Sequence, residues 1–564
     1  QATQMVDKIE QYIALNESTM QPWRNVVTFI NDDEVEFVTH SERFEQQLKT
    51  VGGENLVVDK IYLGAYEQQD TPNGVLAPAV NEAINNRMEK GSLVVNYTGH
   101  GGEVQLSEER ILQRKDVDSW HNGPMYPLMI TGTCEVSRYD DHTRTAIGEY
   151  AFLNQYGGMI AMFTTSRVTG GSDNEAFNKG IYNHLFELKD GKYPCLGDVY
   201  RMAKTRGNIY EKRYVFFGDP ALRIAAPKLK IETESINGMR PEMWQDSVQV
   251  SDTVWQHFTV YSDTVSALQP VEIKGFVKDY NGQVATGFNG TVYVTVYDKV
   301  ADLVAHCDNA VMNFKLRNSI LFKGQTTVEN GRFQISFTVP RDIAYSFGPG
   351  MISYYATNGE IDANGKCEDF IVGGFYEDAT MDTTPPDIEL HIDDIYFVDG
   401  SLASENPVLI AFVEDESGIN TTGSGIGHDI IATLTGAADL SYNLNDCFVS
   451  ESGNPGKGAI TYKMLDLPDG DYTLTLKVWD IYNNSNTAEI HFTVANSLTM
   501  RIDNLYNIPN PFSETTGFVF EHNQIGNNMD VHIYIYDMMG RLVRQLSGQV
   551  AGTSARVEPI RWDG

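Results

Sequence analysis

The chain has 564 residues, 41% of them hydrophobic and 21% charged, which is typical of folded domains and excludes a disordered chain. It carries 42 Lys and Arg against 76 Asp and Glu, a formal net charge of −34, and this acidic excess argues against binding to nucleic acid because phosphates need a basic surface. The sequence holds no run of ~18 apolar residues, so we expect no membrane-spanning helix.

Strand-like and helical segments alternate up to about residue 228. Short apolar runs predict buried strands, and apolar residues at helical spacing predict helices between them. This alternation predicts an α/β layer with a mostly parallel sheet. The expected strands cover residues 25–30, 93–97, 127–131 and 159–164, and the expected helices cover residues 41–49, 77–89, 144–156 and 173–187.

Beyond Pro227 the helical spacing stops, and apolar residues alternate with polar ones between Asn, Gly and Asp turns. This pattern predicts β-sandwiches. A Thr-Pro-Pro linker near residue 384 and a further change near residue 498 divide the region. We therefore expect a multidomain chain, in which an α/β domain is followed by all-β, Ig-like sandwich modules, with limits at residues 1–228, 229–381, 382–497 and 498–564.

Both ends of the sequence indicate a piece of a longer protein. Gln1 begins inside a helical pattern, and the turn signal Trp562-Asp563-Gly564 is followed by no closing strand. We expect the amino-terminal part of the first domain to be missing and the last module to be truncated.

Two strands of the predicted sheet are followed by residues suited to nucleophilic catalysis. His100 stands in a Gly-His-Gly turn after the 93–97 strand, and Cys134 follows the 127–131 strand. Catalytic groups in open α/β sheets lie beyond the carboxyl ends of strands, so the two residues can face each other at one sheet edge. A Cys thiolate is a strong nucleophile, and a neighbouring His can take its proton and return it to a leaving amine. The backbone N–H groups of Gly101 and Cys134 are then the candidate oxyanion hole.

Structural explanations of these residues stay open. A Cys after an apolar strand is often a small buried hydrophobe, and a Gly-His-Gly turn can be only a turn. His121 and His142 are rival bases, and the pair Asp140-Asp141 can bind Ca²⁺ or be a solvated loop. The other cysteines show no CxxC or Cys/His spacing, so we expect them to be structural and expect neither a metal site nor a cofactor; they are Cys195, Cys307, Cys367 and Cys447.

Three motifs resemble the gingipain family of cysteine peptidases, which have a caspase-like fold. They are the 96–101 run Asn-Tyr-Thr-Gly-His-Gly, Cys134 after the next apolar strand, and the 217–222 run Phe-Gly-Asp-Pro-Ala-Leu. The resemblance extends from about residue 23 to residue 224 and implies that His100 is the base and Cys134 the nucleophile. It also implies a third acid near the end of the 25–30 strand. The candidates for this acid are Asp32 and Asp33, and those for substrate contacts are Glu135 and Arg167, all of which can instead be solvated surface residues.

The chain departs from the arginine-specific members of this family. Those carry an acid before the helix that here holds residues 41–44, and our alignment places Val38 or Thr39 there. A buried site that reads a cation needs a carboxylate to pair with it, so we expect no selection of Arg or Lys at P1. Asp219 lies in a turn-forming Asp-Pro pair and is expected to be structural.

The end of the chain carries a second resemblance. Its Pro-Asn-Pro-Phe run at 509–512, the 533–543 segment and the final Trp-Asp-Gly resemble the C-terminal Ig-like sorting domain of type IX secretion cargo. A gingipain-like peptidase with such a tail is similar to the sortases of that system.

The second resemblance implies a bacterial cell-surface enzyme, associated with the outer membrane, that removes the C-terminal signal from cargo proteins. It implies transfer of the new carboxyl terminus to anionic lipopolysaccharide, and an outer-membrane β-barrel partner similar to PorV. A broad extracellular protease similar to gingipains stays open as an alternative, as does a structural surface protein with an inactive peptidase domain. Hydrolysis and transfer share the thioester step, so the sequence does not separate them.

Overall fold

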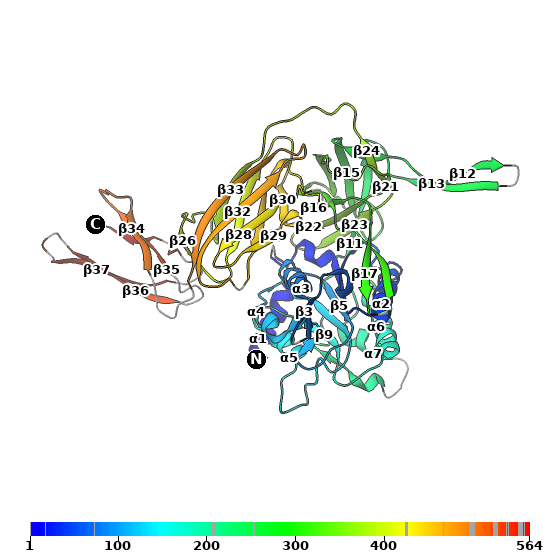
Figure 1. Ribbon diagram of the computed structural model, residues 1–564, viewed down its shortest axis with the longest axis horizontal. Coiled ribbons are helices and arrows are strands. Elements are labelled where there is room, and N and C mark those ends of the chain that lie inside the picture. Colours follow the sequence, from blue (N-terminus) through cyan, green and yellow to red (C-terminus); the bar gives the residue numbers. More distant parts are fainter. Residues whose placement is uncertain are drawn as a thin grey trace.

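An α/β domain is followed by layers built of β-strands in the computed structural model of the chain (Figure 1). The predicted order, a mixed α/β part before strand-rich modules, is confirmed. The structure describes residues 2–16, 18–72, 74–204, 210–251, 254–308, 310–422, 427–465, 467–495, 502–522, 528–536, 539, 541–550, 556–557 and 559–563.

The first domain is built around a six-stranded sheet in the order β10-β9-β8-β5-β1-β2. Neighbouring strands run parallel except for β10, which pairs antiparallel at one edge. The central strands β5, β8 and β9 are buried along their whole length, as expected where helices cover both faces. The strands are β1 (Val26–Asn31), β2 (Val57–Tyr62), β5 (Val94–Thr98), β8 (Leu128–Gly132), β9 (Ala161–Thr165) and β10 (Tyr214–Phe217), beside the short hairpins β3 (Gln69–Thr71) with β4 (Gly74–Leu76) and β6 (Gln105–Leu106) with β7 (Leu112–Gln113).

Helices cover both faces of this sheet and close a hydrophobic core on each. One core is shared by α1, α2, α6 and α7, and the other by α3, α4 and α5. The helix expected at 41–49 begins earlier, at Val35, because Phe37 and Val38 are also buried. The helices are α1 (Ala2–Ile13), α2 (Val35–Leu48), α3 (Pro78–Lys90), α4 (Arg114–Ser119), α5 (Ile147–Leu153), α6 (Gly171–Leu185) and α7 (Leu196–Ala203).

The second module holds a seven-stranded sheet in the order β19-β16-β22-β23-β11-β15-β20 and a three-stranded sheet, β14-β24-β21. Two hairpins leave this module: β12–β13 extends away from the body of the molecule, whereas β17–β18 lies along the first domain (Figure 1). The strands are β11 (Leu229–Ile236), β12 (Met243–Ser251), β13 (Val254–Tyr261), β14 (Thr264–Ala267), β15 (Pro270–Lys278), β16 (Gly290–Tyr297), β17 (Ala301–Cys307), β18 (Ala310–Leu316), β19 (Ile320–Val328), β20 (Arg332–Thr338), β21 (Gly348–Pro349), β22 (Met351–Thr357), β23 (Asp362–Cys367) and β24 (Ile371–Phe375).

The third module consists of a four-stranded and a five-stranded sheet that share one hydrophobic core, β25-β27-β31-β30 and β26-β33-β32-β28-β29. The last strands form the sheets β34-β35-β38 and β36-β37. Each of these sheets draws its strands from one of the predicted modules. The strands are β25 (Asp387–Ile392), β26 (Ser401–Ala403), β27 (Val408–Glu414), β28 (Ile431–Gly436), β29 (Leu440–Asn443), β30 (Phe448–Glu451), β31 (Asn454–Lys463), β32 (Gly470–Trp479), β33 (Ser485–Val494), β34 (Ile502–Ile508), β35 (Thr516–His522), β36 (Met529–Tyr536), β37 (Leu542–Val550) and β38 (Ile560–Trp562).

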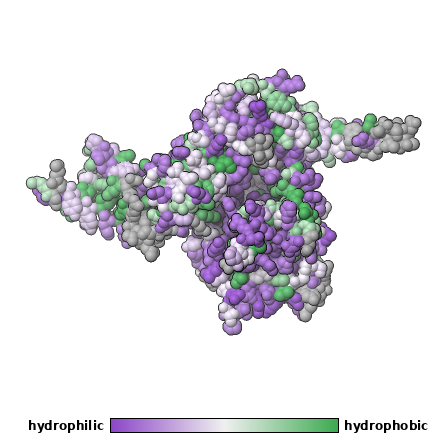
Figure 2. Space-filling model, in the orientation of Figure 1, coloured by the Kyte–Doolittle hydropathy of each residue, from purple (hydrophilic) through white to green (hydrophobic). Residues whose placement is uncertain are grey.

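The first domain presents a mostly polar face in Figure 2. Hydrophilic residues cover most of the face that Figure 2 shows, in agreement with the acidic composition. Among the described helices, none combines the length and the apolar character needed to cross a membrane.

Candidate active site

The turns that carry His100 and Cys134 leave the same edge of the sheet, from neighbouring strands. β5 and β8 are parallel, with Thr98 paired to Gly132, so each residue stands two positions beyond that pair. The turns also touch, because a Cβ added at Gly101 would lie 2.7 Å from the Thr133 hydroxyl oxygen. The structure therefore brings the predicted base and the predicted nucleophile to one place, as the strand-end argument requires.

The imidazole of His100 is held by a carboxylate. A hydrogen bond of 2.7 Å joins its Nε2 to Glu34 Oε1, and the ring of Phe37 meets the imidazole edge-on at a centroid distance of 5.4 Å. This hydrogen bond engages Nε2 of the ring and not Nδ1. Burial lowers the pKa of His100, but the carboxylate of Glu34 opposes it and the net shift is upward. The protonated form of the His100 imidazole is thereby stabilised.

The acid that contacts the His100 imidazole is Glu34 and neither of our candidates for the third acid, Asp32 and Asp33. Asp32 lies beneath the turn, where one carboxylate oxygen accepts the backbone N–H of His100 at 2.8 Å. Asp33 instead accepts a hydrogen bond from the side chain of Gln68 at 3.0 Å. The strand ends at Asn31, and only the third acidic residue after it reaches the ring. The run of three successive acids after an apolar strand was the sequence feature that could have indicated this contact.

The turn that carries Cys134 is fixed by the loop between β9 and α6. The Thr169 N–H lies 3.4 Å from the Cys134 sulfur as a donor, and the hydroxyls of Thr165 and Thr169 both donate to the Thr133 carbonyl. Glu135, directly after the nucleophile, has a φ of +50°. Non-Gly residues adopt this left-handed conformation rarely, and strained backbone conformations cluster at active sites and ligand-binding turns.

Residues 1–225 match the family model Peptidase family C25. We refer to this segment as the C25 domain, after the family model that it matches. The match confirms the resemblance to the gingipain-like cysteine peptidases and covers the strands and turns that carry His100 and Cys134. A search of curated protein sequences gives no match to the chain.

Solved structures similar to the chain include dimeric latent PorU from Porphyromonas gingivalis, with 21% identity and a TM-score of 0.29, over 95% of this chain and 60% of that chain. The Arg-specific cysteine proteinase gingipain R is similar at 14% identity and a TM-score of 0.34, over 66% of this chain and 72% of that one. The complex of pro- and mature domains of RgpB from P. gingivalis matches at 13% identity and a TM-score of 0.33, over 65% and 73%.

The predicted oxyanion hole has its two donors free in the described part of the C25 domain. Neither the Gly101 N–H nor the Cys134 N–H donates a hydrogen bond to another described group there. The Thr133 hydroxyl, which lies against Gly101, is buried and also lacks a partner among the described residues. Two free amides at adjoining turns can receive the oxygen of a tetrahedral intermediate.

The candidate substrate contacts Glu135 and Arg167 are both ion-paired. Glu135 lies 3.6 Å from Arg138, and Arg167 donates to Asp140 in a two-pronged pair. Asp140, which we considered as a calcium ligand, is thus engaged by a guanidinium.

The structure also places one of the rival bases and one of the cysteines that we expected to be structural. The rival base His121 stacks on Tyr156 and is bonded to the Ser119 carbonyl. Cys195 occupies the N-cap position of α7, without a side-chain capping hydrogen bond, and pairs with Arg223 in a β-bridge.

An acid lies closer to the nucleophile loop than our alignment implied. The carboxylate of Glu36 contacts Gly171, since a Cβ added at that glycine would collide with it. Gly171 begins α6, two residues after Thr169, whose N–H faces the Cys134 sulfur. Sequence comparison alone missed this approach because Glu36 and Gly171 are distant in the chain.

Two groups of carboxylates in the described residues lie close enough to share a cation. In the first, Asp32, Asp33 and Glu34 are each already bonded to His100 or Gln68. In the second, within the third module, Asp382, Asp415 and Asp480 accept hydrogen bonds from neighbouring loop groups.

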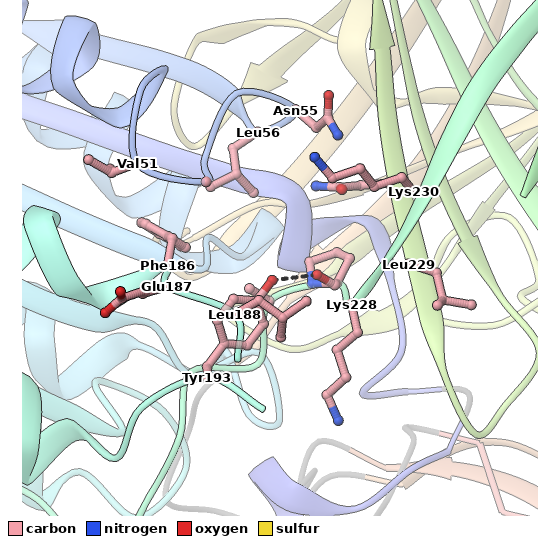
Figure 3. A pocket seen from close by; sticks show the side chains of 14 residues that line it. Val51, Asn55, Leu56, Phe186, Glu187, Leu188, Tyr193, Lys228, Leu229 and Lys230 are labelled. Carbon is pink, nitrogen blue, oxygen red and sulfur yellow. Dashed lines mark hydrogen bonds between the residues drawn. The ribbon is translucent and has the colours of Figure 1, made fainter. Parts of the chain in front are cut away.

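A cavity of about 410 Å³ lies at the junction of the C25 domain with the second module (Figure 3). Its lining includes Leu56, which precedes β2, and the linker residues Pro227 and Lys228. Tyr193 donates to the Pro227 carbonyl at 2.6 Å across it, shown as the dashed line in Figure 3. The cavity lies near the amino end of β2. This is the opposite edge of the sheet from the carboxyl ends of the strands, where His100 and Cys134 lie.

Proposed function

We propose that the chain is a cell-surface cysteine endopeptidase and transpeptidase that acts as a sortase of type IX secretion cargo. The observation that carries the peptidase assignment is the alignment of three groups at one sheet edge: the Glu34 carboxylate on the His100 imidazole, and the Cys134 turn in contact with the turn of His100. A base oriented by an acid beside a thiol is the arrangement that nucleophilic catalysis requires.

The reaction follows from these positions. His100 takes the thiol proton of Cys134, and the sulfur attacks the carbonyl carbon of the scissile peptide bond. The carbonyl oxygen becomes an oxyanion that the N–H groups of Gly101 and Cys134 receive. As the C–N bond breaks, the imidazolium gives its proton to the leaving amine, and an acyl thioester stays on Cys134. An acceptor amine or water then attacks the thioester, and the thiol is restored.

The sorting role rests on the sequence beyond the C25 domain. The Pro-Asn-Pro-Phe run, the 533–543 segment and the Trp-Asp-Gly run are similar to cargo sorting domains, and we propose that the strand-rich modules are Ig-like. On this proposal the substrate is the junction before a cargo sorting domain, and the acceptor is anionic lipopolysaccharide. The enzyme works at the bacterial outer membrane beside a PorV-like partner.

The test is to incubate the protein with a cargo that carries an intact sorting domain, adding a labelled primary amine. We expect mass spectrometry to find the sorting domain released and the amine joined to the new carboxyl terminus, because an amine competes with water for a thioester. The matched control is the same cargo without its sorting domain, which should stay uncut. Cleavage of that control and of unrelated proteins, with no amine adduct, would reassign the chain to a broad gingipain-like protease.

A peptide library varied at P1 measures which side chains the substrate pocket prefers. Our expectation is that Arg and Lys are not preferred, while the approach of Glu36 to Gly171 provides one acid that can read a cation. A preference for basic residues that disappears in Glu36→Gln would overturn the expectation and assign the P1 contact to Glu36.

A further inference from the structure

The β17–β18 hairpin belongs to the second module by sequence but to the C25 domain by packing. Ala305 and Phe314, one on each strand, are buried within the same hydrophobic core as α2 and α6. The two strands pair only with each other among the described residues. Figure 1 shows β17 running beside the first domain, below the sheets of its own module. The hairpin therefore adds buried side chains to the hydrophobic core of the C25 domain, although it lies in the second module by sequence.

The contacts along the hairpin are close and include its backbone. A Cβ added at Gly64, just after β2, would lie 2.5 Å from the His306 carbonyl oxygen. The ring of Phe314 packs on Tyr62 at a centroid distance of 4.7 Å. Lys60 donates to the Lys315 carbonyl at 2.9 Å. These contacts fix the hairpin to the edge strand of the sheet, next to β1.

The tip of the hairpin reaches the turn that carries the acid. The backbone N–H of Asp308 donates to the Asp33 carbonyl at 3.2 Å. The next residue, Glu34, carries the carboxylate bonded to His100. On its other side the turn is held by Asp32, whose N–H donates to the Thr98 carbonyl and whose carboxylate accepts the His100 N–H. The turn that carries Glu34 is thus hydrogen-bonded to the His100 turn on one side and to the hairpin on the other.

We propose that the β17–β18 hairpin positions Glu34 against His100, so that the second module is part of the catalytic unit. This inference rests on the proposed peptidase function of the site. Asp308 acts through its backbone amide and touches no reacting atom, so it is a positioning residue. The charged groups that face His100 are Glu34, Asp32 and Glu108.

The experiment compares two substitutions at one position in the whole chain. Asp308→Pro removes the N–H that binds Asp33, whereas Asp308→Ala keeps it and removes only the carboxylate. We expect Asp308→Pro to lower kcat roughly tenfold with little change in KM, because the base loses its orienting partner, and to lower the pKa of His100 in an NMR titration. Asp308→Ala should resemble the parent protein in both measurements.

A double variant separates positioning from general damage. In the Glu34→Gln background, Asp308→Pro should have no further effect on kcat or on the His100 titration, because the interaction it supports is already gone. An equal additional loss, or an unchanged His100 titration in Asp308→Pro, would overturn the proposal.

If Asp308→Pro does not fold, Gly64→Ala tests the hairpin from the other end, since its methyl group displaces His306. It should lower the His100 pKa in the same direction, and an unchanged titration would overturn the proposal. Trp244→Ala, on the exposed β12–β13 hairpin of the same module, is the control and should leave His100 unchanged. The titration needs no substrate, so a hairpin effect on His100 in a protein that cleaves no peptide would overturn the peptidase function alone.

Discussion

The two flanks of His100 are built differently. On the nucleophile flank, Cys134 leaves β8 and its turn is fixed by Thr165 and Thr169, all within the C25 domain. On the acid flank, Glu34 stands on a turn that is held by the His100 turn on one side and by a hairpin of the second module on the other. The position of the nucleophile is set by local strand pairing, whereas that of the acid depends on a contact between modules.

The difference separates what each flank contributes to catalysis. In the proposed reaction the nucleophile flank supplies the sulfur that forms the covalent intermediate, so its removal should abolish activity. The acid flank supplies orientation and charge to a base that is still present without it, so its loss is partial. Substitutions on the two flanks should therefore differ by orders of magnitude in the catalytic rate that they remove. Each experiment below tests that difference.

Cys134→Ala should abolish cleavage and transfer while leaving the melting temperature nearly unchanged. The side chain is only partly buried, and its polar contacts are with the Thr169 backbone, so little packing is lost. Cargo processing and thermal melting are the two measurements. Cys195→Ala is the matched control and should retain full activity. If Cys134→Ala processes cargo at the parental rate, Cys134 is not the nucleophile.

His100→Ala, between the two flanks, should lower the rate by about 10²–10⁴-fold, the usual range for loss of general acid–base catalysis. Single-turnover cleavage of a cargo peptide measures it. His121→Ala is the control, because His121 lies against Tyr156 and Ser119. A larger effect from His121→Ala would mean that the wrong histidine has been placed at the centre of the comparison.

Glu34→Gln should lower kcat by up to roughly 100-fold, the cost of a misplaced catalytic group. The amide can still hydrogen-bond the ring but no longer stabilises the imidazolium, so the pKa of His100 falls from its raised value. The alkaline limb of the rate profile should then move to lower pH, because the proton for the leaving amine is lost earlier. If the alkaline limb of the pH–rate profile does not move in Glu34→Gln but does move in Asp33→Asn, the acid that supports His100 is Asp33.

The sequence was sufficient for the nucleophile flank because its information is local. Apolar strands followed by Gly-His-Gly and by Cys134 place both groups at carboxyl ends of parallel strands, and the parallel pairing of β5 and β8 aligns them. The α/β domain and the change to alternating strands followed from periodicity in the same way.

The acid flank could not be read in this way. Which of three successive acids reaches the ring depends on the conformation of the turn after β1, and that turn is held by a residue far along the chain, Asp308. The hairpin itself was predicted only as part of a β module. No periodicity shows that Ala305 and Phe314 are buried in another domain's core, because their burial arises from tertiary packing. The approach of Glu36 to Gly171 has the same origin.

The smallest effect on activity is expected for Asp32→Asn, which instead changes stability. Asp32 is 2% exposed, and burial raises its pKa to about 7, while the His100 N–H opposes the rise and the charges of Glu34, Asp33 and Glu109 add to it. The amide of Asn can still accept the His100 N–H, so the turn should keep its shape. Because Glu34 keeps the imidazole bond, kcat should change little.

The pH dependence of the melting temperature measures the stability effect. The folded protein holds the Asp32 proton up to about pH 7, whereas the unfolded chain releases it near pH 4, so this group stabilises the fold most at low pH and the benefit fades as pH rises to 7. Between pH 5 and pH 8 the loss is about 2–3 kcal/mol. Asp32→Asn should therefore flatten the curve and melt higher than the parent at pH 8. The exposed Asp70→Asn is the control and should leave the curve unchanged. If Asp32→Asn melts lower than the parent at pH 8, the ionised carboxylate is a net support of the His100 turn, and the acid flank is held more firmly from within the C25 domain than the comparison assumes.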